Sequence, residues 1–367
     1  MSYDAIVLDT QTIDNYHWRF NEGMLARMKQ FCHSQVDFLM PDIVKNEVQS
    51  HLSKKIKESQ DALDKSLKDA LIHSLLTSKE TESIFENSIQ MVSSDALASS
   101  RIEEYLKKCG AVEIKCSDYT TLDEVFDAYF NLTPPFADRK KRKEEFPDAT
   151  VLFAIEAYAK KSHKKIIAIS RDQGWIEYCS GSDYVTCIQD LGEALTHFQP
   201  RTAPYEFAQR LMLDIEAGKS ITLLDFIRSA VISRYDDVSF MAEADSYLSF
   251  EPEANYCYVS DVEFEPSINV IDVSQDYATF EIKVTVTYNA ECEFNFYHYD
   301  SIDKDNVYLA ATTEFTEVDD TTSVIFTIFN DFDRNYDNMD AEDIELTSVI
   351  KYVNFGSIEP RYEPEQD

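Results

Sequence analysis

Positive charge is scarce in this sequence. Its 367 residues include 34 Lys and Arg against 68 Asp and Glu, which gives a formal net charge of −34. Residues 236–367 hold 32 of the acids and 5 of the bases, so they carry −27, while residues 1–235 carry −7. An acidic protein repels nucleic acid at long range, so binding a polyanion would need local basic patches or metal ions. The change in charge, with a length suited to two domains, predicts a boundary near Arg234.

Cysteine pairs and long apolar runs are missing as well. The seven cysteines form no Cys-x-x-Cys pair, and no Cys/His cluster has the spacing of a zinc site. This argues against structural zinc and is typical of the reduced thiols of a cytoplasmic protein. The opening "MSYDAIVLD" does not resemble a signal peptide, and no apolar run is long enough to span a membrane. We therefore expect a cytoplasmic protein that is not embedded in a membrane.

Short apolar runs alternate with helical segments in the first half of the chain. Such runs occur at 4–9, 36–40, 111–116, 164–170 and 184–188. This alternation predicts a parallel, doubly wound α/β sheet flanked by helices over residues 1–199. No proline occurs between positions 42 and 133, and the polar stretch 50–108 is predicted to be a helical insertion.

The last third of the chain changes its period. Residues 200–235 are helical in character and are expected to form a connector. After them, "TFEIKVTVTY" places Phe280, Ile282 and Val284 on one face, and similar alternation recurs further on. Period two with many Tyr, Phe, Val and Thr predicts a mostly antiparallel β domain over 236–367, ending in a loose tail.

Four acidic residues fall where a parallel sheet places ligands, beyond the carboxyl ends of its strands. Asp9 ends the first apolar run, and Asp172 follows the run at 164–170. Asp148 heads the helix before that run, and Glu47 lies about two turns into the helix after the second run. Each Asp could equally serve as a helix N-cap, and Asp148 is expected to cap its helix while facing the same crevice. Glu47 lies inside a helix, so capping does not explain it.

The four acids together are more informative than any one of them. Two like charges about 4 Å apart repel by roughly 4 kcal/mol at an effective dielectric constant near 20. Carboxylates that converge on one crevice therefore need protonation or a cation. Hard cations such as Mg²⁺ prefer carboxylate and water oxygens. The pattern thus predicts a divalent-metal site at this edge of the sheet.

The sequence segments around these acids resemble those of a known family. The segments "IVLDTQTID", "PDIVKNEV", "FPDATVLFAIEAYA" and "IIAISRDQGW" resemble the four acidic signatures of PIN-like domain nucleases, in particular a larger bacterial subgroup with a helical insertion. The resemblance covers residues 1 to about 199. It implies a Rossmann-like fold and a metal-dependent nuclease that acts mostly on RNA. It also implies that one or two Mg²⁺ or Mn²⁺ ions are held by the catalytic acids Asp9, Glu47, Asp148 and Asp172.

Further residues match or neighbour these motifs. Thr10 and Ser170 match small polar positions of the family, and Asp138 and Glu145 lie near the third motif as weaker candidates. Trp175 is predicted to pack against the sheet, with stacking on a base as the alternative. A basic run is a weak candidate for contacts with substrate phosphates, and its alternative is a solvated loop. This run consists of Arg139, Lys140, Lys141, Arg142 and Lys143.

The expected reaction is hydrolysis of a phosphodiester without a covalent enzyme intermediate. Metal-bound water would attack, and the ions would neutralise charge on the attacking and leaving oxygens. No Ser–His or Cys–His nucleophile is marked, and the seven histidines are interpreted as structural or surface residues. Large proteins of this kind resemble parts of bacterial toxin or antiphage defence systems.

Two other functions start from the same residues. Haloacid-dehalogenase-like phosphatases place a second Asp two residues after the first, but here that position is Gln11. A catalytically silent PIN-like scaffold could instead recruit a protein partner through its acidic β domain. That domain could also mediate oligomerisation or mimic nucleic acid. Calcium binding at 331–343 is disfavoured, because this stretch has no central Gly of the EF-hand type.

Overall fold

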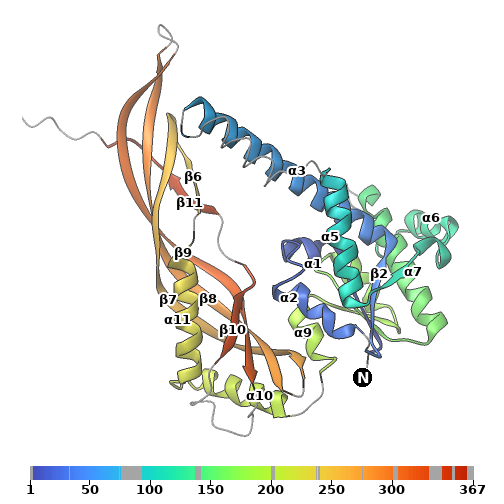
Figure 1. Cartoon of the computed structure of the whole chain (residues 1–367). Coiled ribbons are helices and arrows are strands. Elements are labelled where there is room, and N and C mark those ends of the chain that lie inside the picture. The colour runs from blue at the N-terminus through green and yellow to red at the C-terminus, as the bar shows by residue number, and fades with distance from the viewer. Residues whose placement is uncertain are drawn as a thin grey trace, which may run out of the picture. The chain divides into compact units, whose positions relative to one another are not determined.

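The chain divides into two compact units, Met1–Phe198 and Gln199–Asp367, in the computed structural model. Each unit has its own sheet and is described by itself (Figure 1). The described residues are 3–32, 34–73, 75, 93–136, 142–199, 203–236, 238, 240–274, 276–300, 305–329, 341–348 and 352–361.

A five-stranded parallel sheet forms the centre of the N-terminal unit. Its order is β3-β2-β1-β4-β5, and every neighbouring pair is parallel. All residues of β1 and β4 are buried, as expected for strands covered on both faces. The predicted parallel α/β sheet is thus confirmed. The strands are β1 (Ala5–Leu8), β2 (Asp37–Pro41), β3 (Val112–Ile114), β4 (Ile166–Ile169) and β5 (Val185–Ile188).

Helices connect and cover these strands. The longest, α3, follows β2 directly and projects beyond the sheet, and α5 packs against it (Figure 1). The described helices of this unit are α1 (Thr10–Asn15), α2 (Gly23–Ala26), α3 (Asp42–Ile72), α5 (Ser94–Cys109), α6 (Leu122–Asn131), α7 (Phe146–Ser162), α8 (Gln173–Ser180) and α9 (Leu191–Thr196).

The helical character predicted for the insertion begins before residue 50. Residue 50 is not a boundary, because α3 runs without a break from Asp42 to Ile72. Buried residues recur every fourth position at Val44, Val48, Leu52 and Ile56, which fixes one face of its first half on the unit's core. Part of the predicted insertion, residues 76–92, lies outside the described residues.

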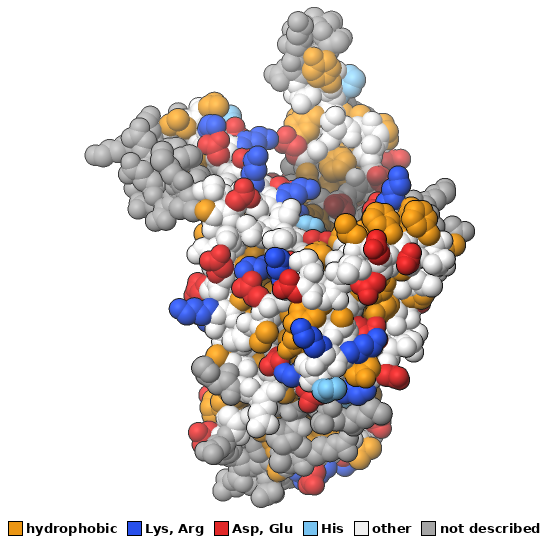
Figure 2. Space-filling model, turned by 90° about the vertical axis from the view of Figure 1, so that its right-hand side faces the viewer, with side chains coloured by type: hydrophobic (Ala, Val, Ile, Leu, Met, Phe, Trp, Pro, Cys, Tyr) orange, Lys and Arg blue, Asp and Glu red, His pale blue; other side chains and the backbone are white. Residues whose placement is uncertain are grey.

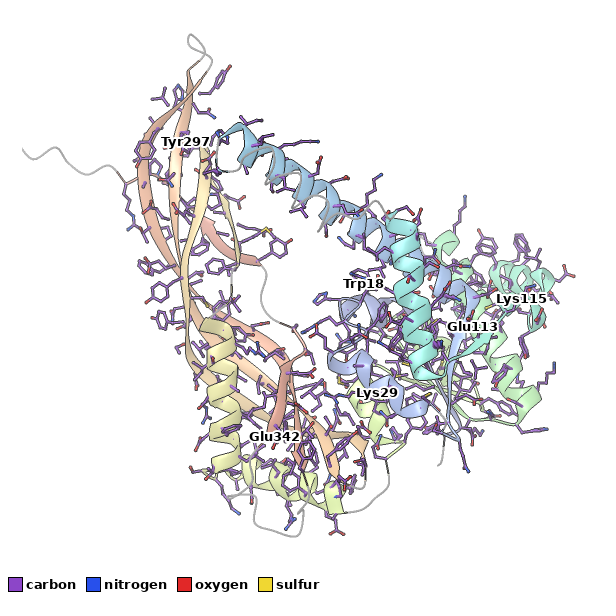
Figure 3. All side chains as sticks on the ribbon, in the orientation of Figure 1. Trp18, Lys29, Glu113, Lys115, Tyr297 and Glu342 are labelled. Carbon is purple, nitrogen blue, oxygen red and sulfur yellow. The ribbon has the colours of Figure 1, made fainter. Side chains whose placement is uncertain are left out.

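A long antiparallel sheet dominates the C-terminal unit, as predicted. Its order is β10-β9-β8-β7, and Tyr297 and Glu342 mark its two ends in Figure 3. A two-stranded parallel sheet pairs β11 with β6. The strands are β6 (Met241–Asp245), β7 (Ser249–Val273), β8 (Tyr277–Asp300), β9 (Asp305–Phe329), β10 (Glu342–Leu346) and β11 (Tyr352–Ser357).

The helices expected to form a connector are part of this second core. Helices α10 (Ala203–Glu216) and α11 (Thr222–Asp236) bury apolar side chains against the long sheet. Phe207 of α10 packs on Phe280 of β8 with ring centroids 5.1 Å apart. Because these side chains belong to one apolar cluster, α10 and α11 cover one face of the sheet.

The expected loose tail is held at its beginning. The backbone N–H of Arg361 donates to Thr312 Oγ1 (2.9 Å), and its guanidinium donates to Glu314 Oε1 (2.8 Å). These contacts fix the chain against β9, and residues 362–367 of the predicted tail lie outside the described residues. Most of the stretch considered for calcium, 331–340, lies outside them too. Within the described part of the chain, no helix is both long and apolar enough to cross a membrane.

Candidate functional site

The predicted acids gather where the strand order of the parallel sheet reverses. The chain leaves β1 toward β2 on one side, whereas β4 lies on the other side of β1. Such a switch point opens a crevice at the carboxyl ends of the two central strands. Asp9 directly follows β1, and Ser170 and Asp172 follow β4. The topology therefore brings together residues more than 150 positions apart in the sequence.

Asp9 is the most enclosed of the four acids, with 6% of its surface exposed. The Ser170 hydroxyl donates to its Oδ2 at 2.7 Å, and Ser170 itself is fully buried. Burial raises the pKa of Asp9 to about 6, although hydrogen bonds from Ser170 and from the backbone of Gln11 and Thr10 favour the charged form. The nearby charge of Asp172 adds to the increase.

Asp148 lies in the first turn of α7 but does not cap it. The N-cap is Glu145, with Phe146 and Pro147 opening the helix, so the capping prediction for Asp148 is wrong. Instead, Asp148 Oδ1 accepts a 2.8 Å hydrogen bond from the indole N–H of Trp175. The pKa of Asp148 is raised to about 7, mainly by burial and further by the charges of the other three acids.

Asp172 is the N-cap of α8. Its Oδ1 accepts from the backbone N–H of Gly174 (2.7 Å) and of Trp175 (3.3 Å). A side chain at position 174 would place its Cβ 2.9 Å from that oxygen and 3.2 Å from Pro135, so this contact requires glycine. Ser170 Oγ also accepts from the Asp172 backbone N–H at 3.0 Å. One buried hydroxyl therefore connects Asp9 and Asp172.

Glu47 reaches the site from α3. The Thr10 hydroxyl donates to Glu47 Oε2 at 2.8 Å, and Thr10 is the first residue of α1, immediately after Asp9. The half-buried Glu47 side chain contributes to the raised pKa of Asp148, so it lies within electrostatic range of that carboxyl group. Glu47 lies inside a helix, so capping does not explain it, and its side chain is turned toward the same crevice.

Each of these carboxylates accepts a hydrogen bond from the chain itself. As these side chains are turned, the described residues contain no group of three or more His, Cys, Asp or Glu that could hold a metal ion. The donor chemistry nevertheless fits a hard divalent cation, since all four side chains offer carboxylate oxygens. Burial and, to a smaller extent, mutual repulsion raise two of their pKa values, and a bound cation would offset both effects.

The weaker candidates are distributed differently. Glu145 is half-buried at the start of α7, and Lys143 is exposed in the turn before it. The other candidates of this loop cannot be placed at the site: only the backbone of Arg142 is described, and Asp138, Arg139, Lys140 and Lys141 lie outside the described residues.

The sequence predicts that Trp175 packs against the sheet, with stacking on a base as the alternative, but it does not predict the contact of Trp175 with Asp148. It is fully buried, so the packing prediction is confirmed, but its indole N–H also holds Asp148. A buried indole usually finds a hydrogen-bond acceptor. One feature of the sequence could have indicated this contact: Trp175 lies three residues after an N-cap Asp, which places its ring in the first turn of α8.

Comparison with known protein families agrees with this geometry. A family model for the PIN domain matches residues 6–175, a range that contains all four acids and ends at Trp175. The N-terminal unit is therefore a PIN-like domain, and PIN domains are typically metal-dependent nucleases that use Mg²⁺ or Mn²⁺. The match leaves the C-terminal unit outside. Comparison with curated proteins gives no match.

Proposed function

We propose that this protein is a divalent-metal-dependent endonuclease that hydrolyses phosphodiester bonds, with RNA favoured over DNA. The main support is the arrangement of Asp9, Glu47, Asp148 and Asp172 around the switch point of a PIN-like sheet. Their neighbours support it too, because buried donors would keep these carboxylates in place.

In this proposal the four acids would hold one or two Mg²⁺ or Mn²⁺ ions. When bound, such an ion activates water and neutralises charge on the attacking and leaving oxygens. The chain's own residues orient the acids: Ser170 ties Asp9 to the backbone of Asp172, and Trp175 fixes Asp148. Burial of Asp9 and Asp148 restricts access of bulk water, which strengthens electrostatic interactions in the crevice.

The test is cleavage of labelled single-stranded RNA and DNA by the full chain with Mg²⁺, Mn²⁺ or EDTA. We expect RNA cleavage with either metal, none with EDTA, and none for Asp148→Asn or Asp172→Asn. Asp69→Asn is the matched control, because this exposed Asp lies near the far end of α3. Cleavage that persists in both site variants would reject the assignment of these residues.

A second candidate is the catalytically silent scaffold. One observation favours it: the carboxylates accept hydrogen bonds from the chain, and no three metal-ligating groups among the described residues surround a common point. Calorimetry with Mn²⁺ separates the two candidates. Binding that is lost in Asp172→Asn supports the nuclease, whereas absence of binding by the wild-type chain supports the scaffold.

The wider role extends the same proposal. We propose a cytoplasmic toxin or defence effector in which the acidic C-terminal unit binds a protein partner or a second copy of the chain. Its support is the separate core of that unit and the −27 charge of residues 236–367. Light scattering of the full chain at rising salt would test self-association, since salt screens the repulsion between two copies of like charge and should favour their association.

A further inference from the structure

Two side-chain contacts join α1 to the first half of α3. In the first, Thr10 donates to Glu47. In the second, His51 Nδ1 lies 2.6 Å from Asp14 Oδ2. Each partner of the second contact lies four residues after its counterpart in the first, and α1 packs against α3. Residues four apart share one face of a helix, so His51 is the next side chain along α3 from the acidic site.

Asp14 fixes which nitrogen of His51 faces solvent. A carboxylate only accepts hydrogen bonds, so Nδ1 carries the proton of this contact and Nε2 lies on the opposite side of the ring. The His51 side chain is 52% exposed. The second oxygen of Asp14, Oδ1, is buried and has no hydrogen-bond partner among the described residues. His51 is therefore held at one end and open at the other.

Lys54 continues this face of α3. At 3.6 residues per turn, Glu47, His51 and Lys54 fall within about 60° around the helix axis. Lys54 is exposed and makes no ion pair with any described residue, whereas Lys55 beside it is paired with Glu58 at 3.0 Å. In Figure 2, Lys and Arg side chains lie among Asp and Glu rather than in one continuous patch. Among the described residues, Lys54 is therefore an exposed cation without an ion-pair partner, one turn beyond His51 on α3.

We propose that His51 and Lys54 form a phosphate-binding track that carries a nucleic-acid strand along α3 toward Glu47, with Asp14 as the residue that positions His51. This inference rests on the proposed nuclease function and adds a substrate subsite to it. In the imidazolium form, both ring nitrogens of His51 donate: Nδ1 to Asp14 and Nε2 to a phosphate oxygen. The Lys54 ammonium binds the next phosphate as a point charge. Such contacts position a strand without reading its sequence.

The test is binding of a 5′-fluorescein oligouridine to the full chain, measured by anisotropy with Mg²⁺. The parent carries Asp148→Asn to prevent cleavage. At about 50 mM salt, His51→Gln and Lys54→Gln should each weaken binding roughly five- to ten-fold, and the slope of log K against log salt should fall by roughly 0.7 per lost contact. Asp14→Asn should weaken binding alone but add little in the His51→Gln background, because both changes remove one contact.

The control is His73→Gln, an exposed histidine just after the far end of the same helix, for which binding should not change. Thermal unfolding checks each variant, and Lys54→Gln carries the test if His51→Gln does not fold. Equal binding by the parent and the double variant, with wild-type protein still cleaving RNA, would overturn this subsite alone. If the parent binds neither RNA nor DNA and the wild type cleaves neither, both proposals are overturned.

Discussion

The two units use acidic residues in opposite ways. The N-terminal unit carries few surplus acids, yet four of them meet at one edge of its sheet, and two have a strongly raised pKa. The C-terminal unit carries most of the negative charge, and part of it is spread across the outer face of its long sheet. The strand pairing places eight acids on that face: Glu251, Glu253, Asp261, Glu263, Glu291, Glu293, Glu317 and Asp319. Convergence of acids, rather than their number, distinguishes a candidate site.

The sheets explain this difference. A parallel sheet covered on both faces leaves polar groups only at its strand ends, so its acids collect at the carboxyl edge. In the antiparallel sheet, alternate residues of β8 such as Ile282 and Val284 are fully buried under α10 and α11. The residues between them, such as Lys283 and Thr285, lie on the other face and are partly exposed. Charge on that face can therefore stay solvated.

The largest expected effect comes from removing acids in each unit. Asp9→Asn should lower RNA cleavage by about a thousand-fold, because it removes a preorganised charge from the crevice. A triple variant, Glu251→Gln with Glu253→Gln and Asp261→Asn, should leave the rate of RNA cleavage unchanged although it removes three charges. Single-turnover cleavage with Mn²⁺ measures both. A loss of cleavage in the triple variant larger than that in Asp9→Asn would show that the outer face takes part in catalysis. The contrast between the two units would then be wrong.

The pH dependence of stability should come next in size. Without metal, Asp148 and Asp9 bind protons in the folded state at pH values where a free Asp, with a pKa of 3.8, has lost them. Each group therefore favours folding at low pH, and this advantage is lost as pH rises from about 4 to about 7. Asn mimics the neutral carboxyl group. Hence Asp148→Asn should gain about 4 kcal/mol over wild type across this window.

Urea unfolding in EDTA at several pH values measures this gain. The triple variant of the outer face should keep the wild-type dependence, since its acids are solvated. Saturating Mn²⁺ should remove most of the gain at pH 7, because a cation stabilises the charged carboxylates of the wild-type protein. A gain that does not change with pH would mean that Asp148 is charged in the folded state throughout.

The parallel sheet and the place of Asp9 and Asp172 at its edge could be predicted from the same pattern. Apolar runs such as "DAIVLD" and "KKIIAIS" are too short and too uniform for surface structure, and each ends in a polar group that topology must place at one edge. The sequence could not predict features that depend on tertiary contacts, such as where a helix begins. Asp148 and Asp172 both precede apolar helical residues, yet only Asp172 caps a helix, because Pro147 allows α7 to begin earlier.

Other parts of the molecule could not be predicted for similar reasons. The sequence of α10 and α11 has a helical pattern of apolar residues, but it does not show that these residues pack against the long sheet. The histidines, including His51, were interpreted as structural or surface residues, and the contact of His51 with Asp14, 37 positions away, was not predicted. Pairings over such distances depend on how α1 and α3 pack, which local patterns do not encode.

Each unit contains a hydroxyl group that donates a hydrogen bond to a carboxylate, and removing these two hydroxyl groups should have different effects on cleavage. Ser170 donates to Asp9 at 2.7 Å in the N-terminal unit, and Thr287 donates to Asp319 at 2.8 Å on the outer face of the other sheet. Ser170→Ala should lower cleavage about a hundred-fold, since it frees a buried carboxylate that should be preorganised. Thr287→Val should have no effect on cleavage. Cleavage by Ser170→Ala at the wild-type rate would show that the Ser170 hydroxyl is not needed to hold Asp9 for catalysis.

The smallest predicted effect concerns Trp175. Trp175→Phe keeps most of the buried ring volume but removes the indole N–H that donates to Asp148 at 2.8 Å. Partners that orient a metal ligand typically contribute ten- to a hundred-fold to affinity or activity. Because Phe preserves packing, we expect the low end, about a ten-fold weaker Mn²⁺ affinity by calorimetry. Trp18→Phe is the control, since the Trp18 indole N–H has no hydrogen-bond partner among the described residues. If Trp175→Phe binds Mn²⁺ as the wild type does, the indole serves packing alone, and Asp148 is held by its helix.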